Sequence, residues 1–353
     1  MTMKKKTFPS CKFARALMAL AVVLAAGLAV FAGFYVRDHK MSNFRGDFVI
    51  FISDTTTVDG LLERFRTDTL CKSFSSLQRA FREEDMQNHL RVGRYEVKRE
   101  HSSIEMARMI KKGWQRPCRL TLSGTIRTKG RLAGLIGAQM MVDSAQVMAA
   151  LNDDAFLSQF GFDSRNVYSM ILPDTYEMYW NATIYEIFKR FYEEYDLFWN
   201  ETRHAKAGEL KLTPLEVSIL ASIVAGETNR KDEYPFVARV YLNRLNKNMK
   251  LQACPTICYL YDYKLTRVLK AHLKMDSPYN TYMYLGLPPG PISVPPKACI
   301  DAVLNPADGN YLYFSANPAF DGTNRFASSY TEHQRMASEY HKAISERQKN
   351  QGK

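Results

Sequence analysis

The feature that most constrains the fold of this chain is an uncharged apolar stretch near its amino terminus. Residues 17–36 read LMALAVVLAAGLAVFAGFYV, twenty residues without a charged side chain. A helix rises about 1.5 Å per residue, so this stretch is long enough to cross a hydrocarbon layer roughly 30 Å thick. The sequence therefore predicts a transmembrane helix over residues 17–36.

The flanking charges predict the orientation of this helix. Five basic residues precede it, namely Lys4, Lys5, Lys6, Lys12 and Arg15, whereas Arg37, Asp38 and Lys40 follow it. The positive-inside rule then keeps residues 1–16 in the cytoplasm and exports everything after residue 36. The alternative is a cleaved signal peptide, but the apolar run is longer than a usual signal core and no small-x-small cleavage site lies beyond it. We expect an uncleaved single-pass anchor in the cytoplasmic membrane.

The remainder of the chain has the composition of a folded ectodomain. Apolar residues make up 46% of the sequence and charged residues 24%, as in globular proteins that bury a core. A location outside the cytoplasm disfavours ATP-driven and nicotinamide-dependent chemistry, and we expect no nucleic-acid partner. The net charge of +12 suits an anionic partner such as a phospholipid surface, or it is a solvated face without a partner.

Local patterns predict two folded parts of mixed α+β class. A small part shows strand, helix, strand, helix and strand signals at 47–53, 58–65, 92–98, 102–113 and 116–124. A helix-rich part begins near residue 125. It contains a proline-rich stretch (277–296) that predicts an ordered loop, then a strand at 310–316 and a polar helix from Thr331.

The most informative helix is LTPLEVSILASIVAGETNR (212–230). Thr213 with Glu216 forms a capping-box pattern, and Pro214 occupies the first helical position. Leu220, Ile223 and Val224 make an apolar stripe that Glu227 extends at helical spacing. A buried carboxyl group finds partners or holds its proton, and a protonated carboxyl group is what a general acid in glycoside cleavage needs. The alternative is that the helix ends at Gly226 and leaves Glu227 exposed.

The residues that follow resemble the endolytic murein transglycosylases of the YceG-like family. The resemblance lies in SILASIVAGETNRKDEYPFVARVYLNRLNKNMKLQACPTICYLY (218–261), LPDTY (172–176), SPYNTYMYLGLPPGPIS (277–293), AVLNPADGNYLYFSA (302–316) and FASSYTEH (326–333). These motifs occur in the family's order and span about residues 119 to 335. The family's catalytic glutamate falls on Glu227. Many members have a second glutamate where this chain has Ala225, so Glu227 is the only acid in the second half of the helix.

The resemblance implies lytic transglycosylation of peptidoglycan glycan strands. In this reaction one carboxyl group serves as acid and then as base, while the 6-hydroxyl of N-acetylmuramic acid (MurNAc) attacks its own anomeric carbon. The expected products are 1,6-anhydroMurNAc ends, released by cleavage of the bond to N-acetylglucosamine (GlcNAc), which ends strand elongation. No metal or organic cofactor is expected.

Five further residues are candidates for orienting the sugars, because amides and phenols offer donors and acceptors to hydroxyl and N-acetyl groups. They are Gln252, Asn280, Tyr279, Asn243 and Arg244. For Asn243 and Arg244 the alternative is a helix cap and a surface ion pair.

These inferences give one domain organisation. We expect a cytoplasmic segment (1–16), a transmembrane helix (17–36), a small LysM-like α+β module (45–124), a YceG-like catalytic transglycosylase domain (125–340) and a polar tail (341–353). The catalytic domain would lie outside the cytoplasm, where its partners are peptidoglycan glycan strands, the cytoplasmic membrane and, as candidates, peptidoglycan synthases.

Two other functions fit the same sequence. A non-catalytic peptidoglycan-binding scaffold of the cell-wall synthesis machinery would hold glycan in the same loops without cutting it. A hydrolytic muramidase would need a second carboxylate near Glu227. By motif, Asp174 is the nearest candidate for that role.

Overall fold

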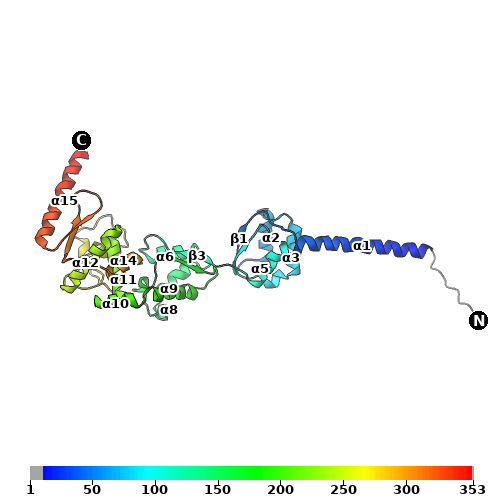
Figure 1. Ribbon diagram of the computed structural model, residues 1–353, viewed down its shortest axis with the longest axis horizontal. Helices are drawn as coiled ribbons and strands as arrows, with labels where there is room; N and C mark the ends of the chain where they lie inside the picture. Colours follow the sequence, from blue (N-terminus) through cyan, green and yellow to red (C-terminus); the bar gives the residue numbers. More distant parts are fainter. Residues whose placement is uncertain (1–10, 352–353) are drawn as a thin grey trace, which may run out of the picture. The chain divides into compact units, whose positions relative to one another are not determined.

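The computed structural model describes residues 11–351, which divide into two compact units. The first unit runs to Cys118 and includes Tyr179–Asn181, and the second comprises Arg119–Met178 and the chain from Ala182 onward. Each unit combines helices with short strands, which confirms the helix-rich α+β fold class (Figure 1). Residues 1–10 of the predicted cytoplasmic segment and 352–353 of the predicted tail lie outside the described residues.

The amino-terminal apolar stretch forms one long helix, α1 (Cys11–His39). Its portion Phe13–His39 is long and apolar enough to cross a membrane, and its most apolar window is not buried by the rest of the structure. An exposed apolar helix of this length is compatible with a membrane anchor. An apolar helix is present where the sequence predicted one, whereas its crossing of a membrane and its orientation there stay predictions.

The end of α1 is held against the rest of the first unit by a partly buried ion pair. Asp38 is 5% exposed and accepts hydrogen bonds from Arg79 Nε at 2.7 Å and Nη2 at 2.8 Å. The Arg79 guanidinium also lies 4.4 Å from the centre of the Phe34 ring. Bidentate pairing of this kind holds both side chains in one geometry, so α1 and the helix that carries Arg79 pack as one body.

The rest of the first unit is a small α+β core. Strands β1 (Phe48–Ile52) and β2 (Gly93–Val97) form an antiparallel ladder in which Ile50 lies opposite Tyr95. The helices that accompany this ladder are α2 (Val58–Thr67), α3 (Phe74–Glu83), α4 (Met86–His89) and α5 (Ser103–Lys112). Helix α5 begins with the Ser102–Glu105 capping box and ends at Gly113, whose φ of +68° suits glycine. The predicted likeness to a LysM module stays a prediction.

The second unit holds most of the helices. Its elements are β3 (Cys118–Thr121), α6 (Lys129–Gly137), α7 (Ser144–Ala150), α8 (Asp154–Ser158), η1 (Val167–Ser169), β4 (Thr175–Met178), α9 (Ile184–Phe198), α10 (Glu201–Glu209), α11 (Pro214–Glu227), η2 (Lys231–Glu233), α12 (Tyr234–Asn246), α13 (Cys254–Leu260), η3 (His272–Lys274), α14 (Lys297–Leu304), β5 (Tyr313–Ala316), β6 (Asn324–Ala327) and α15 (Tyr330–Gln351). Strand β3 pairs with β4, and β5 pairs with β6 in an antiparallel hairpin. The sequence pattern places the end of the first module near residue 124. In the structure β3 belongs largely to the second unit, because its partner strand β4 lies there.

Helix α11 runs through the centre of this unit. Every residue from Val217 to Val224 is buried, because α10, α12, α13 and α14 all pack against it. The sequence predicted that only one face of this helix would be apolar and buried. In the structure the helix is buried on all sides, and the small side chains of Ser218, Ala221 and Ser222 permit this close packing. The proline-rich segment 277–296 contains neither helix nor strand, as predicted, and most of it is at least half-buried.

Candidate active site

The position of Glu227 is set by the way α11 begins and ends. Thr213 accepts a hydrogen bond from the backbone of Glu216, whose carboxylate accepts one from Thr213 N at 2.8 Å, so the predicted capping box is present. The helix ends at Glu227 itself, and Thr228 takes an extended conformation. The last helical residue therefore emerges from the core with its side chain half-buried.

The carboxyl group of Glu227 is held in an environment that favours its protonated form. Burial raises the pKa of Glu227 to about 7. Two groups of α12 act in the opposite direction: the Tyr241 hydroxyl donates a hydrogen bond of 2.5 Å to Glu227 Oε1, and the positive charge of Arg244 favours the carboxylate. A carboxyl group with a pKa near neutrality can both give and take a proton, as an acid/base requires.

The side chains of Asn243 and Arg244 hold the backbone of two segments, one that follows α12 and one that precedes β5. Asn243 Nδ2 donates to the carbonyl groups of Gly309 and Tyr311. Arg244 is 8% exposed, and its Nε and Nη1 donate to the carbonyl groups of Leu312 at 2.7 Å and Leu251 at 2.6 Å. Neither side chain forms the helix cap or surface ion pair considered as an alternative, because their donors bind main-chain oxygens.

Gln252 occupies a constrained turn between α12 and α13. Its φ is +51°, in the left-handed region that few non-glycine residues adopt. The turn is held because Gln252 N donates to Thr281 O at 3.0 Å and Ala253 N donates to Thr281 Oγ1 at 3.0 Å. The side chain of Gln252 is exposed, so its amide is free to meet a ligand.

Asn280 and Tyr279 lie inside the proline-rich loop and shape it. Asn280 is fully buried; its Nδ2 donates to the carbonyl groups of Leu273 and Met275, and its Oδ1 accepts from Tyr282 N. The ring of Tyr279 packs 4.7 Å from that of Tyr259. The amide of Asn280 is therefore occupied by the loop itself, and a contact with sugars from either residue stays a prediction.

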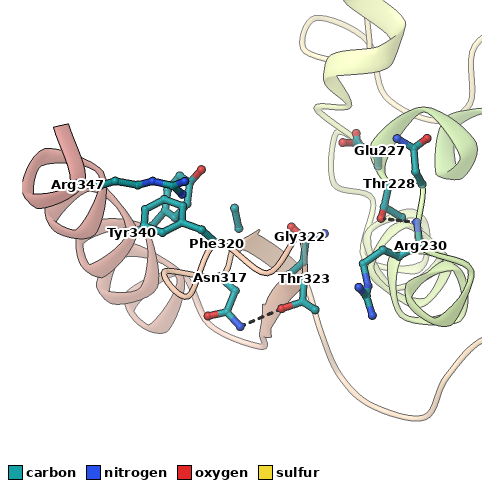
Figure 2. Close-up of a pocket in the computed structure, with 12 residues that line it drawn as sticks. Glu227, Thr228, Arg230, Asn317, Phe320, Gly322, Thr323, Tyr340 and Arg347 are labelled. Atoms are coloured by element: carbon teal, nitrogen blue, oxygen red, sulfur yellow. Dashed lines mark hydrogen bonds between the residues drawn. The ribbon is translucent and has the colours of Figure 1, made fainter. Parts of the chain in front are cut away.

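Two cavities meet at Glu227. The first has a volume of about 640 Å³ and lies between the segment Glu227–Arg230 and the β5–β6 hairpin together with α15. Figure 2 shows Phe320, Tyr340 and Arg347 on the wall opposite Glu227. The second, of about 660 Å³, is lined by residues of α11, α13 and the loops before α6 and α14. Glu227 and Asn229 line both cavities, and Glu227 is the only acid among the lining residues in the described chain.

The buried carboxylate of Glu233 connects two walls of the first cavity. Glu233 is 5% exposed and accepts hydrogen bonds from Thr228 Oγ1 at 2.9 Å and from Asn324 N and Nδ2 at 2.5 and 2.8 Å. The turn that follows Glu227 is thereby linked to strand β6, although nearly a hundred residues separate them in sequence. These three neutral donors satisfy the carboxylate of Glu233 without a cation.

Several residues at the site cannot be identified from the sequence. Tyr241 lies within the VARVYLNRL motif, but nothing in the motif indicates that its hydroxyl reaches Glu227. Asn229 follows the Glu227–Thr228 pair by one residue and was not considered. Cys254 lines the second cavity, and its thiol lies 3.1 Å from the Tyr282 hydroxyl. For Glu233 and Asn324 the sequence carries no signal, because their pairing depends on the fold.

Asp174 does not supply a second carboxylate to this site. It forms an ion pair with Lys297 and accepts a hydrogen bond from Thr175 N at 2.7 Å. The hydrogen bond from Lys297 lowers the pKa of Asp174, and the residue lines neither cavity.

Solved structures support the fold of this chain. A crystal structure of a YceG-like protein from Listeria monocytogenes superposes with a TM-score of 0.54 over 82% of this chain and 98% of that one. The sequence identity is 22%, so the likeness concerns the fold alone.

Sequence comparisons give the family. An endolytic murein transglycosylase of Bacillus subtilis strain 168 is 28% identical over 225 residues, which are 60% of this chain and 62% of that protein. One from Streptococcus pneumoniae strain R6 is 25% identical over 287 residues, 71% of this chain and 51% of its own length. The chain thus spans between half and two thirds of these curated relatives. The model of the YceG-like family matches residues 50–339, and the chain therefore belongs to the YceG-like family, as the sequence motifs predicted.

Proposed function

We propose that this protein is an endolytic lytic transglycosylase of peptidoglycan. It cleaves the MurNAc–GlcNAc bond within nascent glycan strands, leaves 1,6-anhydroMurNAc ends and so terminates strand elongation. The observation that carries the proposal is the half-buried carboxyl group of Glu227, whose pKa is about 7, at the junction of two open cavities. The names of the curated relatives support the same activity.

The reaction needs one group that gives and then takes a proton. Protonated Glu227 donates its proton to the glycosidic oxygen as the bond from that oxygen to the anomeric carbon of MurNAc breaks. The 6-hydroxyl of the same sugar then bonds to the anomeric carbon and gives its proton to Glu227, which restores the acid. An intramolecular nucleophile has an effective concentration on the order of 10⁵ M or more, so no water needs activation.

The set of acids around the site supports this route over hydrolysis. A hydrolytic glycosidase places a second carboxylate beside the scissile bond. In the described chain Glu227 is the only acid that lines the two cavities, while Asp174 and Glu233 are bound elsewhere. A single acid is sufficient when the nucleophile belongs to the substrate.

The cavities on both sides of Glu227 support cutting within a strand. A strand that occupies both places its scissile bond at the junction and extends beyond the site in each direction. Helix α1 would hold this site near the outer face of the cytoplasmic membrane, where new strands emerge. Peptidoglycan synthases are the partners that this location suggests.

The test is digestion of uncrosslinked glycan strands by the full chain in detergent, followed by mass analysis of the new ends. Wild type is expected to produce ends that are one water lighter than hydrolysed ones. Glu227→Gln removes the proton that is transferred and should lower the rate about 10³-fold. Glu216→Gln is the matched control: it makes the same change at the other end of α11, where glutamine also completes a capping box.

Two results would contradict the proposal in different ways. Hydrolysed ends would identify a muramidase. Equal strand binding and no cleavage by wild type and Glu227→Gln would identify a scaffold.

A further inference from the structure

A smaller cavity lies beside the candidate active site and shares a wall with it. Its volume is about 350 Å³, and Arg127 and Tyr263 line both this side cavity and the second catalytic cavity. Lys129, Arg165, Tyr168 and Tyr259 are among its other lining residues. A polymer seated at Glu227 can therefore place a branch in the side cavity.

Three basic residues and one acidic residue line the side cavity. Its acidic lining residue, Asp262, pairs with Lys264 at 3.1 Å, and Arg165 pairs with Asp163 at 2.6 Å. Arg127 and Lys129 form no ion pair in the part of the chain that the structure covers. Arg127 and Lys129 therefore have no ion-pair partner among the described residues, although Asp154 and Asp163 are close enough to Lys129 for their charges to act on it.

Lys129 is less exposed than a solvated surface lysine, and its ammonium group is bound by the protein. Its side chain is half-buried, and its ammonium group donates to Leu151 O at 2.8 Å and Asn152 Oδ1 at 2.7 Å. Burial lowers the pKa of Lys129, and the negative charges of Asp154 and Asp163 act against this shift. An ammonium group has three donors, so one remains for a ligand, and an anion there would relieve the cost of desolvation.

Arg127 is suited to the same ligand. Its guanidinium lies 5.2 Å from the centre of the Tyr263 ring, which orients the planar group while leaving N–H donors free. A guanidinium can bind a carboxylate through two parallel hydrogen bonds. The tyrosine rings of the same wall offer apolar area to the rest of a peptide.

We propose that the side cavity binds the acidic stem peptide of the MurNAc unit at the active site, with Arg127 and Lys129 contacting its carboxylates. This inference rests on the proposed function, because it assumes that a glycan strand occupies the catalytic cavities. Stem peptides leave the strand from the lactyl group of MurNAc and carry free carboxylates. The side cavity gives such a branch both room and opposite charge.

The test measures binding, which does not depend on cleavage. Full-length Glu227→Gln would be titrated with uncrosslinked strands that carry stem peptides, with the same strands stripped by an amidase, and with strands whose peptide carboxylates are converted to amides. Peptide-bearing strands are expected to bind about tenfold tighter than either of the others. Adding Arg127→Gln or Lys129→Gln should remove most of that preference.

Arg131→Gln is the matched control, because Arg131 is an exposed cation of α6 that lines neither cavity. It should leave the preference unchanged. Equal affinity for native and stripped strands would overturn the inference, as would a preference that survives both Arg127→Gln and Lys129→Gln. Tight binding of amidated strands would show that carboxylates are not recognised and would overturn it as well. The proposed function is tested by a different measurement, and it would be contradicted if wild type and Glu227→Gln cut strands at the same rate.

Discussion

The proton on Glu227 is controlled by three influences that the structure separates. Burial favours the protonated carboxyl group, whereas the Tyr241 hydroxyl and the charge of Arg244 favour the carboxylate. The thiols of Cys254 and Cys258 on α13 and the hydroxyl of Tyr282 in the proline-rich loop are close enough to Glu227 for its negative charge to raise their pKa values. Tyr241 is 1% exposed, so its hydroxyl has few other acceptors and holds one oxygen of Glu227 in place.

Replacing Tyr241 with phenylalanine should change the pH dependence of cleavage. The hydrogen bond from Tyr241 stabilises the carboxylate, so its loss raises the pKa of Glu227 above its present value of about 7. Because the proposed cleavage begins from the protonated acid, the wild-type rate should fall as the pH rises through about 7. In Tyr241→Phe that fall should occur at higher pH, with a rate at the optimum lowered about tenfold by loss of positioning. Initial rates measured from pH 5 to 9 would test this.

Tyr176→Phe is the control, since Tyr176 is equally buried and its hydroxyl donates to Leu172 O instead. It should leave the pH midpoint where it is. If the Tyr241→Phe protein were slower at every pH but kept the wild-type pH midpoint, Tyr241 would act through packing alone and not through the pKa of Glu227.

The sequence predicted that Glu227 would extend a buried helix face, but it did not predict the groups that surround this carboxyl group. Glu227 could be found because it extends the apolar stripe of a well-capped helix. Asn243, Arg244 and Asn280 were placed among the sugar-binding residues, yet their side chains bind main-chain carbonyl groups. A polar residue in a loop motif gives the same sequence signal whether it holds a ligand or the loop, because only the fold determines which acceptor is near.

Among the secondary-structure elements, the crossing of α11 and α13 controls the shape of the second cavity. Gly226 lies directly against Pro255, and a Cβ atom at Gly226 would be 2.5 Å from Pro255 Cβ and 2.7 Å from its Cγ. The proline ring is rigid and cannot rotate away. The two helices can therefore approach this closely only if the residue before Glu227 has no side chain.

Gly226→Ala should for this reason be harmful despite the higher helix propensity of alanine. The clash should move α13 and lower the free energy of unfolding by about 1–3 kcal/mol. It should also reduce the rate of cleavage, because Glu227 would be displaced from the wall of the two cavities. Gly134→Ala in α6 is the matched control, because a Cβ there meets nothing within 4 Å. That change should stabilise the protein by about 1 kcal/mol. Denaturant unfolding and initial rates would test both, and a Gly226→Ala protein of unchanged stability and rate would contradict the close packing.

The elements themselves were largely predictable, and the exceptions have physical reasons. Caps such as Thr213 with Glu216 and Ser102 with Glu105 are local, so the helix starts followed from sequence. The assignment of β3 did not follow, because a strand belongs with its partner and that partner, β4, begins more than fifty residues later. Local periodicity indicates that a strand forms but not which strand it pairs with.

At the scale of the whole molecule, the two units have separate cores. In the first unit Leu77, Phe65 and Ile104 belong to a buried cluster that contains no residue of the second. In the second unit a cluster around Leu220 and Val224 surrounds α11. A unit with its own core can lose its packing without disrupting the other, so unfolding of the full chain should not be a single two-state transition.

This separation predicts that core mutations act on one unit at a time. Leu77 and Leu220 are both fully buried, so replacing either with alanine should cost about 3 kcal/mol. In calorimetry of the full chain in detergent we expect two transitions. Leu77→Ala should lower only one transition temperature, and Leu220→Ala only the other. Glycan cleavage below both transitions should survive Leu77→Ala, because Glu227 and both cavities lie in the second unit. A single transition that both substitutions lower equally would mean that the units fold as one cooperative body.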